Sequence, residues 1–176
     1  MRFDTLKRKK YLRRILLTFL VFLTAMAQNV PWLPGILGVH ALPLLPLTVA
    51  IAVLDQEVPA ILFGAFAGLL WDISIPGLPW NAIYPTAAAF ACAMLMRYVL
   101  NHNWLTVSLL SLITAAGHLL LRWFLDTHGM DHAAWALARY TLPSLAYTLL
   151  LVPLCYALVR LIVRKTSRRQ RGVLAE

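Results

Sequence analysis

Six long apolar stretches constrain this 176-residue chain more than any other feature. A helix needs about 20 mostly apolar residues to cross a bilayer. Stretches of about this length run approximately over residues 12–30, 36–54, 58–75, 81–100, 104–125 and 140–163. Because backbone polar groups inside lipid must be satisfied within the protein, we expect an all-α polytopic membrane protein, a bundle of six transmembrane helices.

The composition excludes a soluble protein. Hydrophobic residues make up 61% of the chain and charged residues 13%, against roughly 25% charged residues in soluble domains. A soluble domain of this size has too much surface to hide so many apolar side chains. Most connections between the apolar stretches are short, so we expect a single transmembrane domain over residues 1–176.

The net charge of +9 is concentrated at the two ends of the chain. Residues 1–14 hold seven Lys or Arg, and residues 160–176 hold six. A nucleic-acid binder would spread basic and aromatic residues over a folded face, so this pattern excludes that class. We expect a basic cytoplasmic arm, 1–11, and a basic cytoplasmic tail, 164–176, both lying against anionic lipid headgroups.

The same charges predict the orientation. With the N-terminus inside, the inner segments carry fourteen Lys or Arg and the outer side carries only Arg122 and Arg139. This asymmetry places both termini in the cytoplasm. An alternative is a cleavable secretory signal with its cleavage site near 25–27 (AMA). The long basic arm and the even number of spans favour an uncleaved helix.

The third apolar stretch carries a Gly-x-x-x-Gly pattern ending in an acid. Gly64 and Gly68 lie on one helix face, where another backbone can approach closely, and Asp72 continues that face at the next four-residue step. We interpret this strip as a contact for another helix, inside the bundle or on a partner protein. The alternative is a ligand or ion site at the carboxylate, because ionisable groups at that depth usually pair or line a wet cavity.

The fifth stretch offers a matching polar column. His118, Arg122 and Asp126 are spaced by four residues and share one helix face. Together with Asp72 they form a candidate intramembrane polar cluster near the outer surface. One hypothesis is that Arg122 pairs with Asp72 and joins the two helices; the alternative is that Arg122 extends alone to the lipid headgroups.

Three other positions are candidates for helix packing or partner docking. Asn81 suits the N-cap of the fourth helix. Pro143 and Pro153 lie in the sixth stretch, where each removes a helix hydrogen bond and can bend the helix. A bent helix can form a groove for a partner helix, although such bends are more often plain packing features.

Catalytic and metal-binding patterns are missing from the sequence. It contains no Gly-x-Ser-x-Gly, His-Glu-x-x-His or phosphate-loop motif. His128 and His132, with Asp131 between them, have the spacing of a metal pair but lack a third strong ligand. Cys92 and Cys155 lie in apolar stretches, and we interpret both as thiols packed in the protein interior. We therefore expect no enzyme, no cofactor and no metal; a lipid-modifying enzyme with a dispersed site is the remaining enzymatic alternative.

Several segments together resemble the rod-shape-determining membrane protein family MreD. The similarity covers about three quarters of the chain, excluding the basic ends and the outer loop. It rests on Pro43 and Pro46, and on residues 63–73 (FGAFAGLLWDI), 78–82 (LPWNA), 142–147 (LPSLAY) and 153–156 (PLCY).

The resemblance implies a non-enzymatic scaffold in the bacterial inner membrane that takes part in rod-shape determination and side-wall peptidoglycan synthesis. Implied partners are the bitopic membrane protein MreC, the actin-like MreB and the elongation glycosyltransferase–transpeptidase pair. The family's fold is similar to the substrate-binding subunit of energy-coupling-factor transporters. That similarity supplies the alternative function, a binding subunit of a transporter for a vitamin-type small molecule.

Overall fold

The structure is a computed structural model that describes residues 2–29, 41–54, 57–74, 80–98, 103–127, 135 and 137–174. Within these ranges, side chains are not described for residues 2–9, 29, 57–59, 74, 80, 126–127, 137–138 and 167–174. All regular secondary structure in the described ranges is helical, and they contain no strand. The expected all-α class is confirmed.

The helices follow one another along the chain. The described elements are α1 (Arg2–Asn29), α2 (Leu44–Leu54), α3 (Glu57–Ser74), α4 (Trp80–Tyr98), α5 (Trp104–Thr127), the π-helical segment η1 (Leu137–Thr141) and α7 (Leu142–Leu174). Helices α3, α4 and α5 begin and end within two residues of the expected ranges. Helices α1 and α7 continue well beyond the expected spans at the basic ends, where Lys, Arg and Leu are good helix formers.

Three described helices contain segments that are long and apolar enough to cross a membrane, judged by length and composition. These segments are Lys10–Gln28, Trp104–Leu125 and Arg139–Thr166. Helix α1 shows the corresponding pattern of burial: Leu17, Val21 and Ala25 face the bundle, while Phe19 and Leu23 are exposed. Shorter apolar helices run over Leu44–Leu54 and Ala60–Ile73. The structure therefore has the character of a membrane protein.

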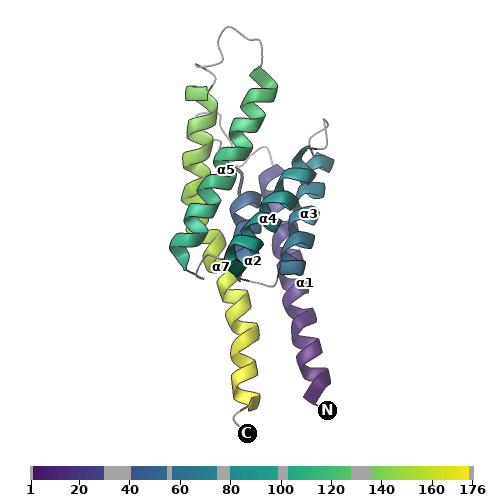
Figure 1. The fold of residues 1–176 in the computed structure, drawn as a ribbon. Helices are drawn as coiled ribbons and strands as arrows, with labels where there is room; N and C mark the ends of the chain where they lie inside the picture. Colours follow the sequence, from purple (N-terminus) through teal and green to yellow (C-terminus); the bar gives the residue numbers. More distant parts are fainter. Residues whose placement is uncertain are drawn as a thin grey trace.

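Both chain ends lie at the same end of the molecule (Figure 1). The N-terminal part of α1 and the C-terminal part of α7 both project from the bundle toward the bottom of this view. The end of α3 and the beginning of α4 lie toward the opposite end.

Helix α2 is much shorter than the expected span over 36–54. Residues 36–40 lie outside the described ranges, residues 41–43 are not helical, and the helix begins only at Leu44. Its 11 residues rise about 16 Å, roughly half the hydrocarbon thickness of a bilayer. Pro43 explains this start, because proline disfavours helical geometry in the residue before it. Pro46 falls in the first turn, where a missing N–H costs nothing.

Side chains from two other helices hold the chain where α2 begins. The Gln28 side chain accepts a hydrogen bond from the Leu44 N–H at 3.2 Å. The Thr148 hydroxyl accepts one from the Leu42 N–H at 3.1 Å. The Cys155 thiol donates to the Pro43 carbonyl at 3.8 Å. Non-helical backbone inside a membrane bundle needs such partners, because its free N–H and C=O groups find no water there to bond.

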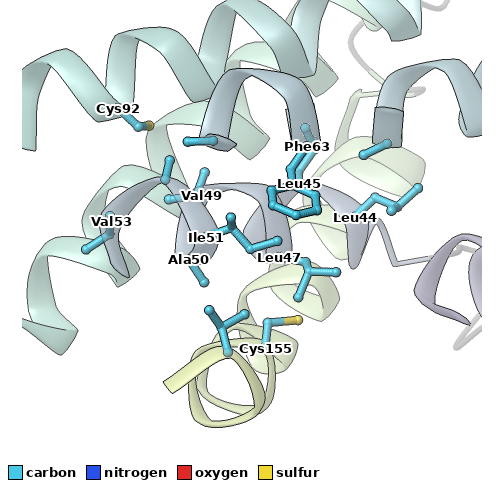
Figure 2. Packing of buried hydrophobic residues seen from close by; sticks show 14 of the residues in the cluster. Leu44, Leu45, Leu47, Val49, Ala50, Ile51, Val53, Phe63, Cys92 and Cys155 are labelled. Carbon is cyan, nitrogen blue, oxygen red and sulfur yellow. The ribbon is translucent and has the colours of Figure 1, made fainter. Parts of the chain in front are cut away.

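Helix α2 forms the centre of the bundle. Every residue from Leu44 to Val53 is buried, so the helix has no exposed face along this length. Figure 2 shows its side chains pointing to all sides, toward Phe63 of α3, Cys92 of α4 and Cys155 of α7. A helix that is apolar all round belongs in the interior, and here the remaining helices enclose it.

Candidate functional site

The two glycines of α3 lie directly against α4. A Cβ atom added at Gly64 would lie 2.8 Å from the Ala89 Cβ and 2.8 Å from the Pro85 carbonyl oxygen. A Cβ atom at Gly68 would lie 2.5 Å from the Asn81 carbonyl oxygen and 2.6 Å from the Ala82 Cα. Any side chain at these positions would force α3 and α4 apart. The small-residue strip is therefore occupied inside the bundle and is not open to a partner helix.

Pro85 contributes to this close approach. A proline inside a helix cannot donate to the carbonyl four residues earlier, which for Pro85 is the carbonyl of Asn81. This carbonyl is the atom that a side chain at Gly68 would meet first. Gly68 therefore leaves space for a carbonyl oxygen that lacks its usual helical donor.

Asp72 binds the start of α4. One carboxylate oxygen, Oδ2, accepts a hydrogen bond from the Ala82 N–H at 2.9 Å. The first N–H groups of a helix have no intrahelical partner, and negative charge near a helix N-terminus is stabilising. Asp72 thus caps α4 from the neighbouring helix, whereas Asn81, the expected cap, is the second residue of α4.

The hypothesis that Asp72 pairs with Arg122 is not what the structure shows. The Asp72 carboxylate is directed to the α4 N-terminus, and its second oxygen, Oδ1, is buried without a hydrogen-bond partner among the described residues. The Arg122 side chain is exposed on α5. The backbone of Asp126 belongs to α5, but its side chain lies outside the description. Of the expected four-residue cluster, the described contacts place Asp72 and His118 against the beginning of α4.

His118 joins α5 to α3 and α4 through ring contacts. Its ring centroid lies 4.8 Å from that of Trp71 on α3 and 5.0 Å from that of Tyr84 on α4. The Tyr84 hydroxyl donates to the Thr114 carbonyl on α5 at 2.7 Å. A Cβ atom at Gly117 would lie 2.5 Å from this hydroxyl, so the glycine makes room for it. We call Trp71, Asp72, Ala82, Tyr84 and His118 the polar junction.

The polar junction contains buried polar atoms without partners. His118 is 4% exposed, and neither ring nitrogen has a hydrogen-bond partner among the described residues. The Asp72 Oδ1 atom is in the same situation. A buried polar group that makes no hydrogen bond costs about 1–3 kcal/mol. Such a cost marks the junction as the strongest candidate site in the described part of the chain.

Sequence reasoning found Asp72 and His118 but missed Trp71 and Tyr84. Both aromatic residues stood in apolar stretches where nothing distinguished them from lipid-facing rings. A usable signal was the spacing of Trp71, three residues after Gly68 and seven after Gly64, which places it beside the glycine strip on the same side of the helix. No signal along the chain indicated that Tyr84 would reach Thr114.

The two prolines of the last helix have different surroundings. Pro143 is the second residue of α7 and lies two residues after the end of the π-helical segment η1. Pro153 lies inside α7 and is exposed on its outer face. Pro153 is therefore the more exposed of the two.

The described residues contain no group of three His, Cys, Asp or Glu side chains arranged to hold a metal ion. The suggested pair His128 and His132, with Asp131, lies outside the described residues. Cys92 and Cys155 are free thiols buried on different helices.

No family model, curated protein or solved structure matches the chain in the comparisons made with each of these.

Proposed function

We propose that this chain is a non-enzymatic scaffold of the bacterial cell-elongation machinery, resident in the inner membrane with both termini in the cytoplasm. Its role would be rod-shape determination and side-wall peptidoglycan synthesis through binding of partner membrane proteins. The proposal rests on the resemblance to the MreD family and on what the matching residues do in the structure.

One observation supports a scaffold in particular. Gly64, Gly68 and Asp72, which carry much of the resemblance, are all used to fasten α3 to α4. Residues that take part in catalysis or transport would be expected to line a cavity that holds the substrate. Here they build a rigid helix pair, which is what a scaffold needs.

The topology that we propose has six crossings. The three long apolar helices alone would leave the chain ends on opposite sides of the membrane. Both ends lie at the same end of the molecule, which supports an odd number of further crossings (Figure 1). Helices α3 and α4 and the chain segment that contains α2 supply them if each crosses once; α2 itself covers only about half of the hydrocarbon thickness.

The outer face of α7 is the surface that we propose for the partner helix of MreC. Pro153 is exposed there, and Leu150 and Leu154 beside it are 71% and 56% exposed. Association of membrane helices depends on close packing rather than on the hydrophobic effect. Leu150, Pro153 and Leu154 form an apolar ridge on α7 against which a partner helix can pack closely.

Co-purification tests this assignment directly. The tagged chain, extracted from its own bacterium in mild detergent, should retain a bitopic membrane protein at a fixed ratio, with MreC as the expected partner. Leu154→Trp should reduce that ratio at least tenfold by disturbing the packing surface. The matched control is Leu105→Trp, which changes a leucine that is 71% exposed on α5 and should leave the ratio unchanged. An equal loss in both variants, or no bitopic partner at all, would contradict the proposal.

A second candidate function is the binding subunit of a small-molecule transporter. The observation that favours it is the set of unpartnered polar atoms at His118 and Asp72. Mass spectrometry of the same purified protein separates the two functions, because a transporter subunit would retain a vitamin-type molecule instead of a protein partner.

A further inference from the structure

We infer that the polar junction binds an ethanolamine phosphate group, the zwitterionic headgroup of an aminophospholipid. This inference goes beyond the scaffold role and does not depend on it. It follows from the atoms that the junction leaves unsatisfied, from the charge of Arg122 nearby on α5 and from the position of these atoms in the bundle.

The unsatisfied atoms call for a hydrogen-bond donor with positive charge. Asp72 Oδ1 can only accept hydrogen bonds while the carboxylate is ionised, and a neutral His118 ring provides one accepting nitrogen. A primary ammonium carries three N–H donors on a compact charge.

The same region offers an electrostatic partner for a phosphate. Arg122 lies one helical turn beyond His118 on α5 and is exposed. A lone ammonium ion would meet repulsion from this guanidinium, whereas a zwitterion places its phosphate there and its ammonium at Asp72. The opposite charges of Asp72 and Arg122 therefore select a ligand that carries both signs.

The position of the junction fits a lipid headgroup. Asp72 is two residues from the end of α3, and Ala82 is two residues after the beginning of α4. This end of the helix pair lies away from the chain termini, at the level where the chain turns back (Figure 1). The unpartnered atoms are covered by protein in the structure, so binding requires the Asp72 or His118 side chain to turn outward.

Thermal unfolding of the purified, delipidated full-length protein in detergent tests the inference with phosphatidylethanolamine as the probe. At ten times its Kd this lipid should raise the Tm by about 4 °C. Phosphatidylcholine has the same phosphate but no N–H donor on its amine, and it should leave the Tm unchanged. Equal shifts with both lipids, or no shift with either, would overturn the inference.

Two variants assign the effect to the junction. His118→Phe keeps an aromatic ring between Trp71 and Tyr84 but removes both nitrogens. Asp72→Asn keeps an oxygen to accept from the Ala82 N–H but removes the charge. Each should abolish the shift caused by phosphatidylethanolamine. Ser108→Ala, which removes a hydroxyl bonded within α5, should keep the shift. A full shift in both junction variants would contradict the inference.

Two further measurements complete the test. Soluble phosphoethanolamine identifies the source of the group: a shift with it supports the site and shows that a free zwitterion suffices, whereas a shift with the lipid alone supports a membrane source. If neither junction variant folds, native mass spectrometry of the wild-type protein decides. Retention of phosphatidylethanolamine at least tenfold above phosphatidylcholine supports the inference, and equal retention contradicts it.

Discussion

At the scale of single residues, the α3–α4 contact depends on the absence of side chains. Gly68 approaches the backbone of α4, which cannot move aside, whereas Gly117 approaches only the terminal hydroxyl of Tyr84. The same added methyl group therefore has different consequences at the two positions. Backbone contacts resist change more strongly than the end of a flexible side chain.

We expect Gly68→Ala to lower the free energy of unfolding by about 2 kcal/mol, the usual range for an overpacked interior. Gly117→Ala, the matched control, should cost less than half as much because the Tyr84 side chain can shift. Thermal unfolding of both variants in the same detergent measures the difference. Equal stability of wild type and Gly68→Ala would show that the two helices are not packed this closely.

The Asp72 carboxylate gives a second prediction for a single residue. Asp72→Ala removes the acceptor for the Ala82 N–H and should cost about 1 kcal/mol, as the loss of a helix cap does. Asp72→Asn retains an acceptor oxygen and should recover most of that loss. Chemical denaturation of both variants checks the order, and an Asn variant as unstable as the Ala variant would contradict the capping role.

The sequence predicts which residues share a helix face but not which neighbour they meet. The four-residue spacing of Gly64, Gly68 and Asp72 was enough to place them on one strip. The partner of Asp72 was not predictable from charge alone, because a backbone N–H only ten residues along the chain competes with the guanidinium of Arg122. A buried acceptor takes the donor that the fold brings to it.

At the scale of helices, α2 is the element that the sequence described least well. Its apolar pattern suggested a full span, but its start is determined by groups far away in the chain. The Thr148 hydroxyl that binds the Leu42 N–H is 106 residues distant. Contacts over such separations leave no local trace in the sequence, whereas α3, α4 and α5 are bounded by nearby turn residues and were predicted closely.

The start of α2 provides a prediction for this element. Thr148→Val leaves the buried Leu42 N–H without its acceptor and should cost about 2 kcal/mol. Thr48→Val is the control: its hydroxyl is equally buried but bonds only the Leu45 carbonyl within the same helix. Denaturant titrations of the two variants should differ clearly. Similar stability of both would mean that Thr148 does not hold the start of α2.

At the scale of the whole molecule, a buried central helix and a fastened helix pair give a bundle with an internal framework and apolar outer faces. Gly64, Gly68 and Asp72 make their contacts inside the bundle. On α7, by contrast, the apolar side chains of Leu150 and Leu154 are exposed. The basic ends of α1 and α7 emerge together (Figure 1). This division between a closed interior and an available outer surface is what we expect of a scaffold.

Cysteine labelling of intact spheroplasts tests this account most directly. In a Cys92→Ala and Cys155→Ala background, single cysteines at positions 5, 103, 127 and 167 report which side each helix end occupies. With a membrane-impermeant maleimide, the account predicts labelling of Thr127→Cys from outside. Thr5→Cys, Asn103→Cys and Ser167→Cys should react only after lysis. Positions 5 and 167 found on opposite sides of the membrane would contradict a bundle with an even number of crossings and both ends in the cytoplasm.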